Sequence, residues 1–136
     1  MKKQILILDD DVSIRTLLDL FLRKDYNVIA KKDGVDAMMW LEEGNIPDLI
    51  ISDVNMPHLN GYDFLINLKK SGYFRTIPVM ILSGIENANE KLKFFEIGAF
   101  EFVYKPFNPT DLLSKIDAAI KPKNIISNVK AEEPII

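Results

Sequence analysis

The feature that most constrains the fold of this chain is a regular alternation between short apolar runs and longer segments with apolar residues at helical spacing. An apolar run of about four residues without strict polar alternation predicts a strand that is buried on both faces. The five such runs are residues 5–8, 28–30, 49–52, 79–82 and 102–104. A strand followed by a helix, repeated five times, predicts an α/β protein with a doubly wound, five-stranded parallel sheet and five helices.

The fourth and fifth predicted helices carry local signals. In the fourth, Leu92 and Phe95 are expected to form the buried stripe, with Phe94 as a further candidate. The fifth is expected to begin with Asn108 as its N-cap and Pro109 at its first helical position.

The end of the chain breaks the alternation. Residues 122–136 contain two prolines and two apolar pairs, but the apolar residues have no helical or strand period. We therefore expect one domain over residues 1–121, followed by a flexible C-terminal tail or linker over residues 122–136.

Composition excludes several functional classes. The chain has a net charge of −3 and no basic stripe, so direct nucleic-acid binding is not expected. It has no cysteine, which excludes disulfides and thiolate metal sites. There is no basic amphipathic helix for a membrane surface, and no apolar run approaches the roughly 20 residues of a membrane span. We expect a soluble, cytoplasmic protein with no membrane contact.

Charged and polar residues stand where the predicted strands end. The first strand ends in Asp9 and Asp10, the third at Asp53, the fourth at Ser83 and the fifth at Lys105. The carboxyl ends of parallel strands lie at one edge of the sheet, where ligands bind in this architecture. Clustered carboxylates repel one another unless a cation intervenes, and hard oxygen ligands suit Mg²⁺ or Mn²⁺.

The same groups suit phosphoryl chemistry. A carboxylate can act as a nucleophile and form an aspartyl-phosphate, and Asp53 is the candidate. Lys105 and Ser83 are suited to bind phosphoryl oxygens. Asn55, two residues after Asp53, could turn its backbone carbonyl toward the metal, and Gly61 is expected to adopt a backbone angle that other residues avoid.

Four segments strongly resemble the receiver domain of two-component response regulators. They read "ILILDDD", "LIISDVNMPHLNG", "PVMILSG" and "GAFEFVYKPF", and the resemblance extends from residue 3 to about residue 121. It implies the flavodoxin-like fold of the chemotaxis-regulator-like superfamily.

The resemblance also implies roles for residues around the acid cluster. Asp53 matches the phosphoryl acceptor, which also binds the metal. Asp10 matches the acid that binds Mg²⁺ directly, and Asp9 matches the second acid, often acting through water. Asn55 matches the position whose backbone carbonyl binds the metal.

Three further positions match residues that respond to the phosphoryl group. Ser83 matches the hydroxyl that follows the phosphoryl group after transfer, and Lys105 matches the lysine that forms a salt bridge to it. The bond from Lys105 to Pro106 is commonly cis in such proteins. Phe102 matches the aromatic switch, although it lacks the hydroxyl of the more usual tyrosine.

The implied function is a step in a two-component phosphorelay. A sensor histidine kinase or a histidine phosphotransfer protein would supply the phosphoryl group. The expected chemistry is limited to self-phosphorylation from phosphodonors and self-dephosphorylation. Phosphorylation would then change the surface of the fourth helix, fifth strand and fifth helix, residues 86–120, where a downstream protein binds. We favour a stand-alone regulator over the receiver of a longer protein.

Two alternatives remain open from the sequence. One is a phosphohydrolase of the haloacid dehalogenase type, with Asp9 as the nucleophile and Asp11 as the general acid and base. That hypothesis leaves Asp53 and its loop unexplained. The other is a receiver-like binding module that never takes up phosphate.

Overall fold

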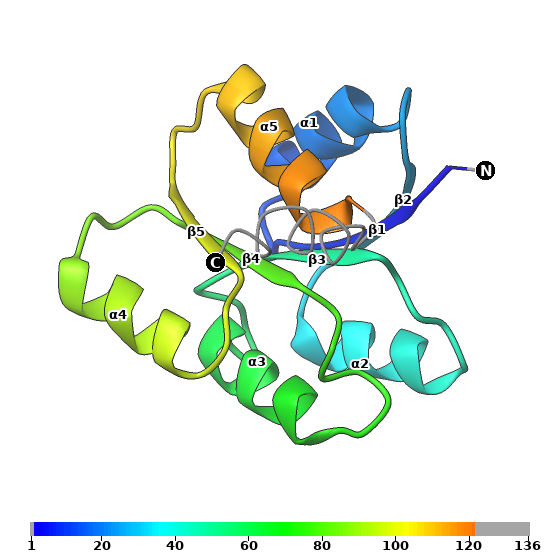
Figure 1. The fold of residues 1–136 in the computed structure, drawn as a ribbon, viewed down its shortest axis with the longest axis vertical. Helices are drawn as coiled ribbons and strands as arrows, with labels where there is room; N and C mark the ends of the chain where they lie inside the picture. Colours follow the sequence, from blue (N-terminus) through cyan, green and yellow to red (C-terminus); the bar gives the residue numbers. More distant parts are fainter. Residues whose placement is uncertain (1, 122–136) are drawn as a thin grey trace, which may run out of the picture.

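The computed structural model describes residues 2–121, which form five strands and five helices in strict alternation (Figure 1). The strands are β1 (Gln4–Leu8), β2 (Asn27–Lys31), β3 (Leu49–Asp53), β4 (Val79–Ser83) and β5 (Glu101–Tyr104). The helices are α1 (Val12–Leu22), α2 (Gly34–Glu42), α3 (Gly61–Lys70), α4 (Ala88–Glu96) and α5 (Pro109–Ile120). The α/β architecture expected from the sequence is confirmed.

The sheet is entirely parallel, with the strand order β2-β1-β3-β4-β5. Helices α1 and α5 cover one face, and α2, α3 and α4 cover the other (Figure 1). Each face has its own apolar core; Leu18 and Ile116 belong to one, and Phe64 and Phe94 to the other. The strand order reverses at β1, which lies between β2 and β3, so the crevice beyond the carboxyl ends of β1 and β3 is where this architecture binds ligands.

Burial along the strands follows their place in the sheet. Every residue of β3 and β4 is buried, as the continuous apolar runs predict. The edge strand β2 differs, because its residues are exposed or half-buried. The expected burial on both faces is therefore only partial in β2: Ile29 and Val28 pack against the two opposite cores, but an edge strand has a neighbour on one side only and stays more exposed.

In α4 the buried stripe differs from the one expected. Phe94 is 2% exposed, whereas Leu92 is 60% and Phe95 38% exposed. The ring of Phe94 packs between those of Tyr62 and Phe102, with centroid separations of 5.4 and 5.6 Å. These ring contacts fix the rotation of α4 about its axis. The helix therefore turns Phe94, rather than Leu92 or Phe95, toward the sheet.

Helix α5 begins as predicted. The Asn108 side chain accepts a hydrogen bond from the backbone N–H of Asp111 at 3.1 Å, and Pro109 stands in the first turn. The expected tail, residues 122–136, lies outside the described residues. Among the helices of residues 2–121, none has the length and apolar character needed to span a bilayer.

Candidate functional site

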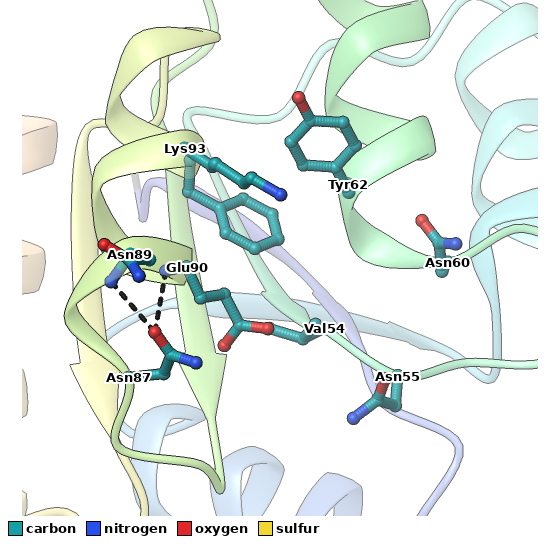
Figure 2. A pocket seen from close by; sticks show the side chains of 9 residues that line it. Val54, Asn55, Asn60, Tyr62, Asn87, Asn89, Glu90 and Lys93 are labelled. Atoms are coloured by element: carbon teal, nitrogen blue, oxygen red, sulfur yellow. Dashed lines mark hydrogen bonds between the residues drawn. The ribbon is translucent and has the colours of Figure 1, made fainter.

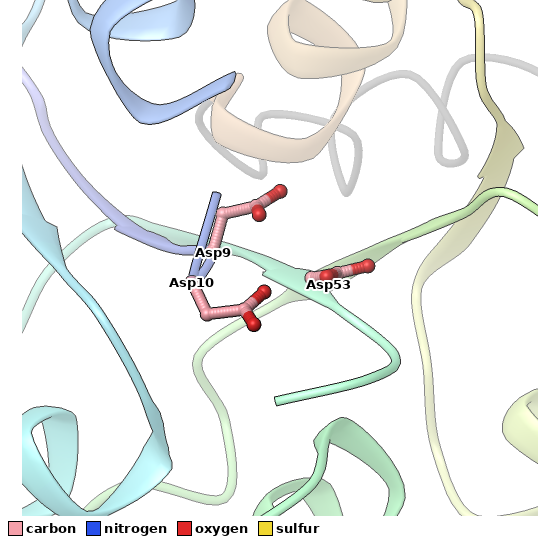
Figure 3. Close-up of side chains that lie close together, drawn as sticks. All are labelled: Asp9, Asp10 and Asp53. Carbon is pink, nitrogen blue, oxygen red and sulfur yellow. The ribbon is translucent and has the colours of Figure 1, made fainter. Parts of the chain in front are cut away.

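Two neighbouring strands bring the acidic residues together. Leu8 pairs with Ser52 in the register of β1 and β3, so Asp9 and Asp53 follow at adjacent strand ends. Asp9, Asp10 and Asp53 each offer one carboxylate oxygen, and these three oxygens lie within 4.8 Å of one another (Figure 3). Asp9 and Asp53 are buried and Asp10 is exposed, so the cluster is open to solvent on one side.

Asp9 is held in place by hydrogen bonds to both carboxylate oxygens. Its Oδ1 accepts from the backbone N–H of Asp11 at 2.9 Å, and its Oδ2 accepts from Lys105 Nζ at 3.3 Å. Burial raises the pKa of Asp9 above its ordinary value of 3.8, and the nearby Asp53 carboxylate raises it further. The hydrogen bonds lower this pKa without cancelling the increase, so a cation beside Asp9 would stabilise its ionised form.

Lys105 joins the two buried acids. Its ammonium lies 3.2 Å from Asp53 Oδ1 and 3.3 Å from Asp9 Oδ2. Burial lowers the pKa of Lys105, but the charges of Asp53 and Asp9 outweigh burial and raise it overall. The Lys105–Pro106 peptide bond is cis, as the resemblance implies. Lys105 is therefore a fixed positive charge at the end of β5.

The arrangement leaves one oxygen of Asp53 available for reaction. Lys105 and the backbone N–H of Val54 both donate to Oδ1 of Asp53, the latter at 2.9 Å. No donor within residues 2–121 hydrogen-bonds to Oδ2 of Asp53. A carboxylate with one oxygen anchored and the other free has the geometry that a nucleophile needs.

The donor set fits a small divalent cation. Three carboxylates and one ammonium leave an excess of negative charge, and carboxylate oxygens are the ligands that Mg²⁺ prefers. Asn55 is exposed and lies two residues after Asp53 in the loop that follows β3, so its backbone carbonyl could join this set. Asp9, Asp10 and Asp53 are the side chains that would hold the ion.

The loop after β3 is shaped by close packing at Gly61. The N–H of Gly61 donates to the carbonyl of Val54 at 2.8 Å, and a Cβ at Gly61 would overlap the carbonyl oxygen of Asp53. The expectation of an unusual backbone angle at Gly61 was wrong: the left-handed residue in this loop is His58, with φ of 69°. Gly61 is required for space, because a side chain there would displace the end of β3.

Ser83 ends β4 and is 2% exposed. Its Oγ accepts from the N–H of Ile85 at 3.2 Å and lies 3.1 Å from the carbonyl of Ile85. Oγ also lies 3.0 Å from a carboxylate oxygen of Glu90. The hydroxyl thus stands at the same edge of the sheet as the acids and is hydrogen-bonded within its own segment and to α4.

Phe102 is buried, with an exposure of 3%. Its ring contacts those of Phe94 and Tyr104, at centroid separations of 5.6 and 5.5 Å. The ring is thus already inside the core between the sheet and α4.

Sequence reasoning missed Glu90. It lines a cavity of about 410 Å³ beside the site, together with Asn55, Asn87 and Lys93 among others (Figure 2). The available signal was the spacing of Asn87 and Glu90, which is that of a helix N-cap and an acid three residues later. That spacing predicts the start of α4 but not a contact with Ser83.

Comparison with known proteins identifies the family. Residues 5–117 match the model of the response regulator receiver domain. The chain is 36% identical over 122 residues to the response regulator GtcR of Aneurinibacillus migulanus, covering 89% of this chain and 49% of that protein. It is 33% identical over 126 residues to the alkaline phosphatase synthesis transcriptional regulatory protein PhoP of Bacillus subtilis, covering 92% of this chain and 51% of that protein. This chain therefore belongs to the response regulator receiver family, and it spans about half the length of the curated relatives it matches.

Solved structures agree with this assignment. The chemotaxis response regulator CheY4 of Vibrio cholerae has a TM-score of 0.80 and 29% identity, covering 88% of this chain and 99% of that one. The receiver domain of a signal transduction histidine kinase from Syntrophus aciditrophicus has a TM-score of 0.80 and 32% identity. The match covers 87% of this chain and 89% of that one. The flavodoxin-like receiver fold is confirmed.

Family membership argues against the phosphohydrolase alternative, and so does Asp11. The Asp11 side chain accepts from the N–H of Ser13 at 2.8 Å and caps α1. Its carboxylate is engaged at the helix end, whereas that alternative needs it as a general acid and base.

Proposed function

We propose that this chain accepts a phosphoryl group on Asp53 and relays the event through its surface. The observation that carries the proposal is the pair of contacts made by Lys105, which anchors one oxygen of Asp53 beside Asp9 and leaves the other free. The phosphodonor is proposed to be a phosphohistidine on a sensor histidine kinase or a phosphotransfer protein.

In the proposed reaction, Oδ2 of Asp53 attacks the phosphorus of phosphohistidine. A P–O bond forms, the P–N bond breaks, and the imidazole leaves with the bonding electrons. Lys105 orients the carboxylate and then binds a phosphoryl oxygen. Mg²⁺ held by Asp9, Asp10, Asp53 and the carbonyl of Asn55 would offset the negative charges that meet in this step. Later hydrolysis returns inorganic phosphate and the free carboxylate.

The proposed output is a shift between two conformations. The phosphoryl group would draw the Ser83 hydroxyl toward Asp53. The Phe102 ring, which is already buried, would then shift its position within the core. The elements attached to these residues are α4, β5 and α5, so residues 86–120 form the proposed docking surface for a downstream protein. PhoP is named a transcriptional regulatory protein and CheY4 a chemotaxis regulator, so receivers of this family serve different outputs. We propose that this one signals by protein contact and does not itself bind nucleic acid.

Labelling by a small phosphodonor tests the proposal. Incubation with radiolabelled acetyl phosphate is expected to label the parent protein in the presence of Mg²⁺ and not in the presence of EDTA. The Asp53→Asn variant is expected to lose the label, and Asp63→Asn, which changes an exposed acid at the start of α3, is expected to keep it. A folded parent that takes no label would favour the binding-module alternative.

A further inference from the structure

We propose that Glu90 is a positioning residue that holds the Ser83 hydroxyl away from Asp53, so that phosphoryl binding must break a Ser83–Glu90 hydrogen bond. The inference rests on the proposed function. It assigns to α4 a side chain that favours the unphosphorylated conformation.

The Ser83 hydroxyl lies near two acceptors but can donate to only one of them at a time. A serine hydroxyl has one hydrogen to donate, and two acceptors lie within reach of it: Glu90 Oε1 at 3.0 Å and the Ile85 carbonyl at 3.1 Å. The carboxylate is the stronger acceptor, since hydrogen bonds to ionised groups are stronger than those between neutral groups. A phosphoryl oxygen on Asp53 must therefore compete with Glu90 for the same hydrogen.

The carboxylate of Glu90 is available for this contact because α4 is capped without it. The Asn87 side chain accepts from the N–H of Asn89 at 2.9 Å and from that of Glu90 at 3.2 Å. In a capping box the acid at this position binds the backbone of the N-cap residue. Here the Glu90 carboxylate is directed toward Val54, the residue after Asp53 (Figure 2).

The Glu90 carboxylate has no ion-pair partner among the residues that the structure describes. Across residues 2–121, no nitrogen of a basic side chain lies within 4.0 Å of its carboxylate. A phosphoryl group on Asp53 would add negative charge next to Val54, the residue toward which the Glu90 carboxylate is directed. Repulsion between the two groups would add to the competition for the hydroxyl, and movement of Glu90 would carry the first turn of α4 with it.

The test uses beryllofluoride, a phosphoryl mimic, in the presence of Mg²⁺, with affinity measured by calorimetry. Removing a net hydrogen bond is expected to make Glu90→Ala bind about fivefold more tightly than the parent. Glu90→Gln keeps an acceptor oxygen and is expected to show a smaller gain. Glu96→Gln, which removes the same charge from the exposed end of α4, is the control and is expected to match the parent.

A second comparison isolates the role of Ser83. The gain from Glu90→Ala is expected to be larger in the parent than in a Ser83→Ala background. Equal gains would show that Glu90 acts by charge alone, and unchanged or weaker binding by Glu90→Ala in the parent would also overturn the inference. A merely structural role would lower the thermal midpoint of Glu90→Ala without tightening binding. A folded parent that binds no beryllofluoride would instead overturn the proposed function, and this inference with it.

Discussion

Asp9 illustrates how a single residue of the site works against stability. It is 1% exposed and lies beside another buried carboxylate, and both conditions disfavour its ionised form. Lys105 and the N–H of Asp11 offset part of this penalty. A residue that opposes folding in this way is expected where ligand binding requires the charge.

Replacing Asp9 is expected to stabilise the metal-free protein at neutral pH. The folded pKa of Asp9 lies above its unfolded value of 3.8, so the folded state holds this proton more tightly and ionisation opposes folding. The penalty is fully present above the folded pKa and is lost as the pH falls from the folded pKa to the unfolded value of 3.8. Urea unfolding in EDTA should therefore give Asp9→Asn a higher midpoint than the parent at pH 7, and the difference should shrink in acid. A difference that grows in acid would contradict the assignment.

At the scale of the elements, α4 and the loop after β3 are each fixed by contacts with other elements. Helix α4 is oriented by the contacts of the Phe94 ring with Tyr62 and Phe102. The loop is fixed by the approach of Gly61 to the backbone of Asp53 and Val54. These contacts support the site without belonging to it.

Two neighbouring phenylalanines of α4 provide a matched pair for the first contact. Phe94→Ala is expected to cost about 3–5 kcal/mol of unfolding free energy, because it empties a buried ring site. Phe95→Ala removes the same atoms from a ring that is 38% exposed and is expected to cost much less. Chemical denaturation of both variants measures the difference, and equal losses would contradict the observed orientation of α4.

Gly61→Ala tests the loop. Its Cβ would overlap the Asp53 carbonyl and lie 3.1 Å from the Cα of Val54, so the end of β3 must shift. We expect a loss of about 1–3 kcal/mol, the range for overpacking, together with slower labelling by acetyl phosphate. The control is Gly72→Ala, where an added Cβ meets nothing within 4 Å. Labelling of Gly61→Ala at the parent rate would show that the close approach does not position Asp53.

At the scale of the whole molecule, the fold and most residues of the candidate site could be predicted, because the sequence indicates where each strand ends. Apolar runs locate the strands, and parallel pairing brings Asp9, Asp53, Ser83 and Lys105 to one edge of the sheet. The rotation of α4 could not be predicted, because Leu92, Phe94 and Phe95 are all apolar and only packing against other elements chooses among them. The contact of Ser83 with Glu90 could not be predicted either, because it depends on how α4 packs beside the end of β4.

Metal binding should be visible in the stability of the whole molecule. A cation that binds the folded state alone stabilises it by about 1.4 kcal/mol at ten times its dissociation constant. Mg²⁺ is therefore expected to raise the thermal midpoint of the parent and to have a much smaller effect on Asp10→Asn. An equal rise in both proteins would place the ion elsewhere.

The proposed function depends on the conversion of Asp53 to an acyl phosphate. The most direct measurement is to treat the protein with acetyl phosphate and Mg²⁺, reduce the product with borohydride, and locate the reduced residue by peptide mass spectrometry. We expect modification at position 53 alone. Modification at position 9, or a reduced residue elsewhere in a protein whose position 53 is untouched, would contradict it.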